Sequence, residues 1–139
     1  MIYLAWLGVV PFILSILLNF FDYSLGAYSG AQIFVFYSVI ICCFMAGTLW
    51  GQAIKDNVNW LKKAFASNLI ALTVFFCLIF GGTKTVLLTM VICYLLLVIY
   101  ECILYRQSDD KTMMSNYIRM RIQVTLTVVV LHIALYLSL

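Results

Sequence analysis

The sequence predicts an all-α, polytopic integral membrane protein with five transmembrane helices and a cytoplasmic N-terminus. Of its 139 residues, 66% are hydrophobic and 9% are charged, whereas a soluble domain is about 45–50% apolar and about 25% charged. Apolar runs of about 20 residues, long enough to cross the hydrocarbon core as helices, alternate with short polar segments. Residues 1–139 therefore read as a single transmembrane domain.

The first apolar run, residues 2–21, is long for a signal peptide and follows no basic segment, so we expect a retained helix. Pro11 lies near its middle and removes a backbone hydrogen bond, which predicts a kink. Ser15 and Asn19 follow at intervals of four, so the three residues share a face that should point toward protein. A turn-rich loop is expected over residues 22–30.

The second run, residues 31–54, carries a ridge of small residues. Cys43, Gly47 and Gly51 are spaced four apart and stack on one face of a helix. In a bilayer, such a face lets another helix backbone approach closely, and the dispersion attraction between the two backbones favours association. The ridge predicts a helix-packing surface, although the same spacing also arises by chance in membrane helices.

The remaining chain divides into three further expected helices: from Ala64 to the Gly81-Gly82 pair, over residues 85–105, and from Asn116 onward. Polar segments separate them, at residues 55–63, 81–84 and 106–115. Trp60, in the first of these segments, fits an interfacial anchor.

Basic residues are distributed unequally between the two sides of this topology. Seven fall on the side of the N-terminus and one, Lys84, on the other; the seven are Lys55, Lys62, Lys63, Arg106, Lys111, Arg119 and Arg121. Cytoplasmic loops are enriched in Lys and Arg, so the N-terminus is expected in the cytoplasm or matrix. The N-terminal run lacks the Arg- and Ser-rich character of a transit segment, which favours a bacterial inner membrane over a mitochondrial one.

Several function classes are disfavoured by the motifs. The chain contains no HExxH, GxSxG, Walker or Rossmann pattern, and its five cysteines lie in apolar runs without a CxxC pair. Its basic residues occupy short loops, unlike the dense stripe of a nucleic-acid-binding domain. No catalytic residue, metal site, cofactor or nucleic-acid partner is therefore expected.

Two charges near the ends of neighbouring helices predict an ion pair. Glu101 lies about one turn from the end of the fourth helix, and Arg121 about one turn into the fifth. Because the loop between them is short, the helices should be antiparallel neighbours with both charges at similar depth. The pair fits either a structural clamp or a site for a ligand head or a proton.

Polar residues also follow one side of the fifth helix. At about 100° per residue, four of them fall within about 60° of one another: Arg121, Thr125, His132 and Tyr136. Tyr94 lies on the fourth helix on the side that carries the glutamate. Such a stripe serves as interhelical hydrogen bonding, lines a proton path, or holds the polar head of a lipid or quinone.

Three motifs resemble those of a known family. Leu7-Gly8 with Pro11-Phe12 is similar to the family's LGxxPF opening. Residues 37–51 resemble its YGxxILSFLGGxHWG segment. Residues 117–125 resemble its WYxxLRxxLT signature. This is the family typified by transmembrane protein sixty-nine, a mitochondrial protein, which also includes many bacterial proteins of unknown function. The resemblance implies a five-helix inner-membrane fold.

The same resemblance implies that four residues form one site or one structural knot: Trp50, Gly51, Glu101 and Arg121. The sequence departs from the family at Leu49, where a histidine is usual, at Asn116, where a tryptophan is usual, and at Asn68, where a proline is usual. Any chemistry that depends on that histidine would be lost in this chain.

Three functions are consistent with these patterns. The leading hypothesis is a non-enzymatic accessory or assembly factor that packs in the bilayer against a larger membrane complex or a second copy of itself. The second is a small channel or transporter that uses the polar stripe. The third is a subunit that binds a lipid or quinone at headgroup level, with Glu101, Arg121 and Trp50 at the pocket.

Overall fold

A computed structural model of the chain describes residues 2–55, 60–107 and 112–139. Within these residues, the expected all-α fold is confirmed, with five helical spans long and apolar enough to cross a membrane. Large apolar side chains cover the outside, as at Phe44 (72% exposed) and Phe80 (82% exposed). Such a surface is stable against lipid tails and would be unstable in water.

The first span is broken into two helices, α1 (Ile2–Leu7) and α2 (Val10–Phe20). Pro11 occupies the first turn of α2, where its missing N–H costs little. The expected kink is therefore a break that lies just before the proline.

The break leaves a carbonyl that another helix uses. In a regular helix the Gly8 carbonyl would accept from the Phe12 amide, but that amide donates to the Val9 carbonyl at 3.1 Å. The Tyr37 hydroxyl of α3 (Gly30–Lys55) donates to the Gly8 carbonyl oxygen at 2.9 Å. This bond ties the break to the middle of the bundle.

The segment expected to be a loop contains a small hairpin. Strands β1 (Ser24–Leu25) and β2 (Tyr28–Ser29) pair antiparallel, with Ser24 opposite Ser29. Gly26 has φ +64°, a conformation that favours glycine and makes the tight turn inexpensive.

The hairpin leads directly into α3 through a capping box. Ser29 Oγ accepts from the Gln32 amide at 3.3 Å, and Gln32 Oε1 accepts from the Ser29 amide at 3.0 Å. At Gly30, a Cβ would overlap with the backbone of Asn19 and lie 2.6 Å from the Ser15 carbonyl oxygen. Glycine is thus required where α2 and α3 cross.

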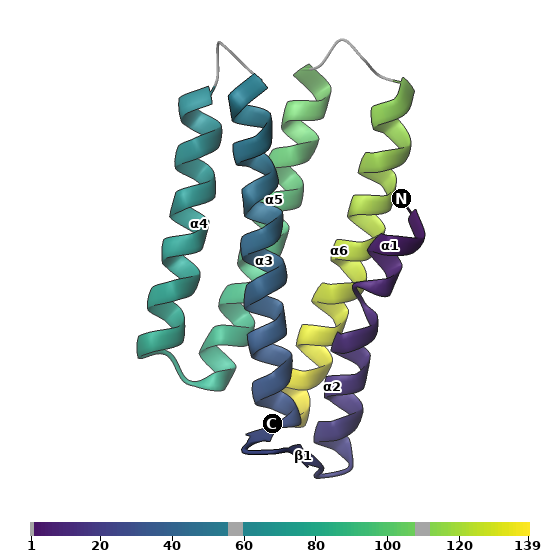
Figure 1. Ribbon diagram of the computed structural model, residues 1–139, viewed down its shortest axis with the longest axis vertical. Helices are drawn as coiled ribbons and strands as arrows, with labels where there is room; N and C mark the ends of the chain where they lie inside the picture. Colours follow the sequence, from purple (N-terminus) through teal and green to yellow (C-terminus); the bar gives the residue numbers. More distant parts are fainter. Residues whose placement is uncertain (1, 56–59, 108–111) are drawn as a thin grey trace.

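The helix α3 runs through the middle of the molecule (Figure 1). It contacts α2, α4 (Trp60–Phe80) and α5 (Thr83–Gln107), while α6 (Thr112–Ser138) contacts α1, α2 and α5. Buried apolar residues of α2, α3, α4, α5 and α6 form the core, including Phe12, Phe34, Val74, Leu97 and Leu135.

Two expected helix boundaries are wrong by about one turn. The third span begins at Trp60 instead of Ala64, and α6 begins at Thr112 instead of Asn116. Hydropathy marks where a helix enters lipid, whereas Lys and Met have high helix propensity and extend it beyond that point. The polar segment expected over 55–63 is correspondingly shorter, and residues 56–59 lie outside the described residues.

Candidate functional site

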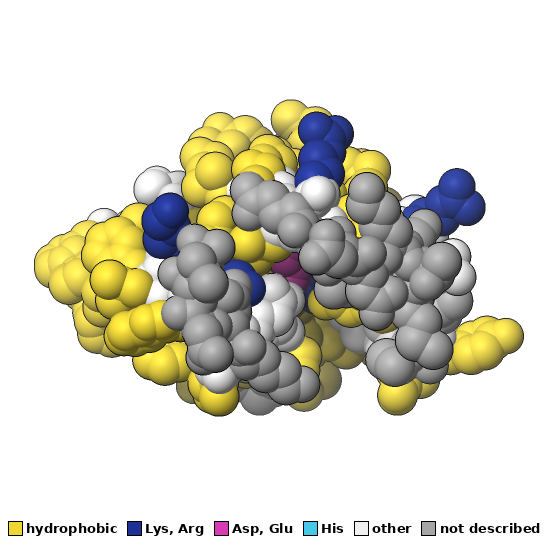
Figure 2. All heavy atoms as spheres, turned by 90° about the horizontal axis from the view of Figure 1, so that it is seen from above, with side chains coloured by type: hydrophobic (Ala, Val, Ile, Leu, Met, Phe, Trp, Pro, Cys, Tyr) yellow, Lys and Arg dark blue, Asp and Glu magenta, His cyan; other side chains and the backbone are white. Residues whose placement is uncertain are grey.

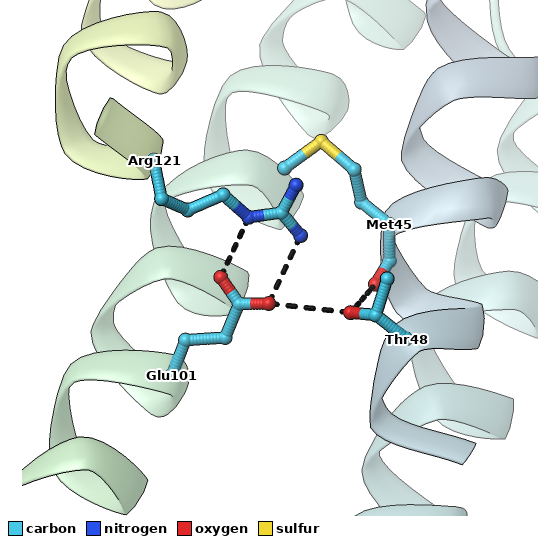
Figure 3. A network of polar contacts seen from close by, with 4 residues as sticks. All are labelled: Met45, Thr48, Glu101 and Arg121. Carbon is cyan, nitrogen blue, oxygen red and sulfur yellow. Dashed lines mark hydrogen bonds and ion pairs between the residues drawn. The ribbon is translucent and has the colours of Figure 1, made fainter. Parts of the chain in front are cut away.

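Glu101 of α5 and Arg121 of α6 meet as a two-pronged ion pair (Figure 3). Arg121 Nε lies 2.7 Å from Glu101 Oε2, and Nη2 lies 2.9 Å from Oε1. The Arg121 side chain is 13% exposed and the Glu101 side chain 2%. Parallel N–H bonds to both carboxylate oxygens give this geometry its strength, and the opposite charges of the two groups leave the pair with no net charge.

A hydroxyl from α3 completes the environment of the carboxylate. Thr48 Oγ1 lies 3.2 Å from Glu101 Oε1 and 2.7 Å from the Met45 carbonyl oxygen (Figure 3). The single hydroxyl hydrogen therefore faces two acceptors. Through these contacts, three helices converge on one buried carboxylate.

The ion pair lies toward the end of the bundle that carries basic residues. Figure 2 looks onto that end, where an acidic side chain is visible in a hollow and dark blue side chains project nearby. Lys62, Arg106 and Arg119 are exposed at the same ends of α4, α5 and α6. Lys and Arg near helix ends place their charges in the interface, where water lowers the cost.

A cavity of about 270 Å³ lies beside the ion pair, between α1, α2, α3, α5 and α6. Its polar groups are Arg121, Thr125 and Tyr94. Its other lining residues are apolar or lack polar side chains: Leu4, Ala5, Gly8, Val9, Phe12, Ile41, Phe44, Met45, Val124 and Val128. Apolar walls with a few converging polar groups are typical of sites for small amphipathic ligands.

The cavity borders the outer surface of the bundle. Leu4 and Phe44, two of its lining residues, are each 72% exposed and belong to the outer faces of α1 and α3. In a bilayer these faces meet lipid tails. A lipid-soluble molecule could therefore enter sideways from the membrane.

Thr125 is the unusual polar residue of this cavity. Its side chain is buried. Among the buried nitrogen and oxygen atoms of the described side chains, the Thr125 hydroxyl oxygen is the one that has no hydrogen-bond partner. A helical Thr or Ser ordinarily bonds to the carbonyl four residues earlier, as Ser15, Thr73, Thr89 and Thr127 do here. An unpaired hydroxyl costs free energy, so this one points to a missing partner.

His132 lies in a separate, fully bonded network. Its Nδ1 is 2.8 Å from the Val128 carbonyl oxygen, which assigns the proton to Nδ1 and leaves Nε2 to accept from Ser38 Oγ at 2.7 Å. The Tyr94 hydroxyl donates to the Ser38 carbonyl oxygen at 2.9 Å. The network joins α3, α5 and α6.

Aromatic rings surround the imidazole. Phe34, Tyr94 and Phe12 have ring centroids 4.7, 5.5 and 5.7 Å from that of His132. Neither Ser38 nor His132 is exposed, and neither lines the cavity beside the ion pair. The contacts of the histidine are those of an interhelical connector.

The other expected site residues lie apart from the ion pair. Trp50 is exposed, and its Nε1 donates to Asn68 Oδ1 of α4 at 3.3 Å. The ring of Tyr136 has the Lys84 ammonium 5.5 Å from its centroid. The polar stripe of α6 is thus divided among separate environments.

The ridge of small residues faces outward. Cys43, Gly47 and Gly51 are all exposed, and a Cβ added at either glycine would meet nothing within 4 Å. Within the described chain, α3 instead approaches α4 closely at Ala46, whose carbonyl accepts from Ser67 Oγ at 2.8 Å. The predicted packing surface is open to another molecule.

Comparison with known proteins identifies the family of this chain. The profile of a protein family of unknown function, DUF3429, matches residues 1–137. The chain belongs to this family. Searches of curated proteins and of solved structures found no match.

For this member of the family, the structure gives several motif residues a physical role. Gly8 and Tyr37, from two different motifs, form the hydrogen bond at the helix break. Phe12 packs against Tyr37, with ring centroids 4.8 Å apart. These contacts stabilise one wall of the cavity.

Sequence reasoning missed Ser38 and Thr48. Both are hydroxyl residues inside an apolar run, and such residues usually bond to their own helix. Their contacts with His132 and Glu101 depend on how α3 is rotated against α5 and α6. The sequence signal that could have found them is weak: two hydroxyl residues in the longest motif-bearing apolar run of the chain.

Proposed function

We propose that the protein is a non-enzymatic membrane protein that binds an amphipathic, lipid-soluble molecule in the cavity between α1, α2, α3, α5 and α6. The observation that carries the proposal is the unpartnered, buried hydroxyl of Thr125, a residue that lines a mostly apolar cavity together with Arg121. A ligand would supply the missing hydrogen bond to the hydroxyl and cover the apolar walls. These features favour the third of the sequence-based hypotheses.

Photo-crosslinking tests this proposal on the full chain in lipid nanodiscs. The probes are two diazirine lipids, an uncharged long-chain alcohol and a long-chain carboxylate. At least one probe should label α1, α3 and α6 at the cavity, and Ala5→Phe should abolish this labelling by filling the space. Ala134→Phe, which adds the same ring on an exposed position of α6, is the matched control. Uniform labelling of lipid-facing positions in all three proteins would refute a specific site.

A partner-binding role is a second candidate, favoured by the outward position of Gly47 and Gly51. In this role, the ridge receives a helix of a larger membrane complex or of a second copy. Gly47→Leu and Gly51→Leu should each abolish association, measured by crosslinking in the membrane, while insertion stays normal. Unchanged association in both variants would exclude the ridge as the contact.

A channel or transporter has less support, because the stripe residues occupy separate environments.

We infer further that the end bearing Lys62, Arg106 and Arg119 faces the cytoplasm, as the charge bias predicts. A bacterial inner membrane and a kinship with transmembrane protein sixty-nine remain part of this proposal. The match of residues 1–137 to a family of unknown function supports this kinship.

A further inference from the structure

Two polar groups of the cavity remain free to donate a hydrogen bond. The Tyr94 hydroxyl hydrogen is already donated to the Ser38 carbonyl. Arg121 uses Nε and Nη2 for Glu101, and its third nitrogen is turned away from the carboxylate (Figure 3). That nitrogen can only donate, and the unpartnered Thr125 hydroxyl can donate too. A ligand group that satisfies both must be an acceptor.

The charges of the cavity are already balanced. Arg121 is the charged lining residue, and the bidentate contact with Glu101 neutralises it. A phosphate or carboxylate would add an uncompensated negative charge close to the Glu101 carboxylate, within apolar walls. Alternatively, Arg121 would have to leave its partner and strand a buried carboxylate. An uncharged acceptor requires neither.

We propose that the cavity binds an uncharged lipid whose polar group is a carbonyl oxygen, as in a quinone with an apolar tail. The inference rests on the proposed binding function and adds the class of ligand to it. A carbonyl oxygen has two lone pairs, one for Thr125 and one for the free Arg121 nitrogen.

The size of the cavity fits such a head. An apolar protein cavity of about 150 Å³ can hold benzene, so about 270 Å³ holds a ring with several small substituents. A longer tail would pass between the exposed side chains of Leu4 and Phe44 into the surrounding lipid. Apolar surface on the tail then stays out of water throughout.

Equilibrium binding of a radiolabelled decyl-benzoquinone to the full chain in nanodiscs tests the inference. Wild type should bind one molecule per chain saturably, and Thr125→Val should weaken binding about 5- to 10-fold, the effect of one lost hydrogen bond. Thr127→Val is the matched control, because that hydroxyl donates to the Gln123 carbonyl at 3.0 Å. Its affinity should equal that of wild type. Equal affinities in all three proteins would overturn the assignment of Thr125.

A competition with phosphatidic acid tests the charge argument. Phosphatidic acid should not displace the quinone from wild type, whereas Glu101→Gln, which frees the Arg121 charge, should gain affinity for it. Displacement from wild type that is lost in Thr125→Val would overturn the uncharged class and leave the proposed binding function intact. Saturable binding of neither probe would refute both.

Discussion

Glu101 and Arg121 stabilise the bundle as a pair, and removing one should cost more than removing both. Glu101→Leu leaves a guanidinium that is 13% exposed without its partner. Breaking a fully buried pair costs about 3–5 kcal/mol, and water near Arg121 reduces that figure. Glu101→Leu with Arg121→Met should recover much of the loss in unfolding free energy, measured in detergent with a double-variant cycle. Additive losses would contradict the coupling.

At Thr125, the unpaired hydroxyl should destabilise the empty protein. Thr125→Val removes an unsatisfied buried group while keeping its shape, so the ligand-free protein should unfold at an equal or higher temperature. Ser38→Ala, which leaves His132 Nε2 without its donor, should lower that temperature. A loss of stability in Thr125→Val comparable to that in Ser38→Ala would indicate that the threonine has a partner within the protein.

At the scale of single helices, glycines of α3 separate into two kinds. Gly30→Ala would force a Cβ into the backbone of Asn19 and should disrupt the α2–α3 crossing, whereas Gly47→Ala meets open space. The first variant should lose several °C in thermal unfolding, and the second should equal wild type or exceed it because Ala is the better helix former. Equal behaviour of the two would contradict the close approach at Gly30.

The break between α1 and α2 makes a second prediction about an element. Tyr37→Phe removes the hydroxyl that donates to the Gly8 carbonyl, at a cost of about 0.5–1.5 kcal/mol. Amide exchange in α1 should accelerate relative to wild type and to Tyr28→Phe, which changes an exposed tyrosine of the hairpin. Unchanged exchange in Tyr37→Phe would show that α1 is held by other contacts.

The elements also show what local sequence could and could not predict. Apolar runs of spanning length predicted all five spans, and Pro11 predicted a disturbance in the first. The short connection between the last two helices predicted that Glu101 and Arg121 lie at similar depth. The structure brings them together as an ion pair. Ser38, Thr48 and the cavity depend on the rotation of α3 against its neighbours, which periodicity in one chain does not encode. The outward position of Gly47 and Gly51 depends on the same packing.

For the whole molecule, the distribution of basic residues predicts the topology. In a variant without native cysteines, Trp60→Cys at the basic end should be labelled by a membrane-impermeant maleimide only after the cytoplasmic face is opened. Ser24→Cys, in the hairpin at the opposite end of α3, should be labelled in intact cells. The reverse pattern would overturn the orientation.

Native mass spectrometry of the protein, extracted gently from its own membrane, would show whether the cavity holds a ligand. We predict that wild type and Ala134→Phe carry one uncharged lipid-soluble molecule per chain, and that Ala5→Phe, with its cavity filled, carries none. The same bound molecule in all three proteins, or none in wild type, would contradict a ligand site in this cavity.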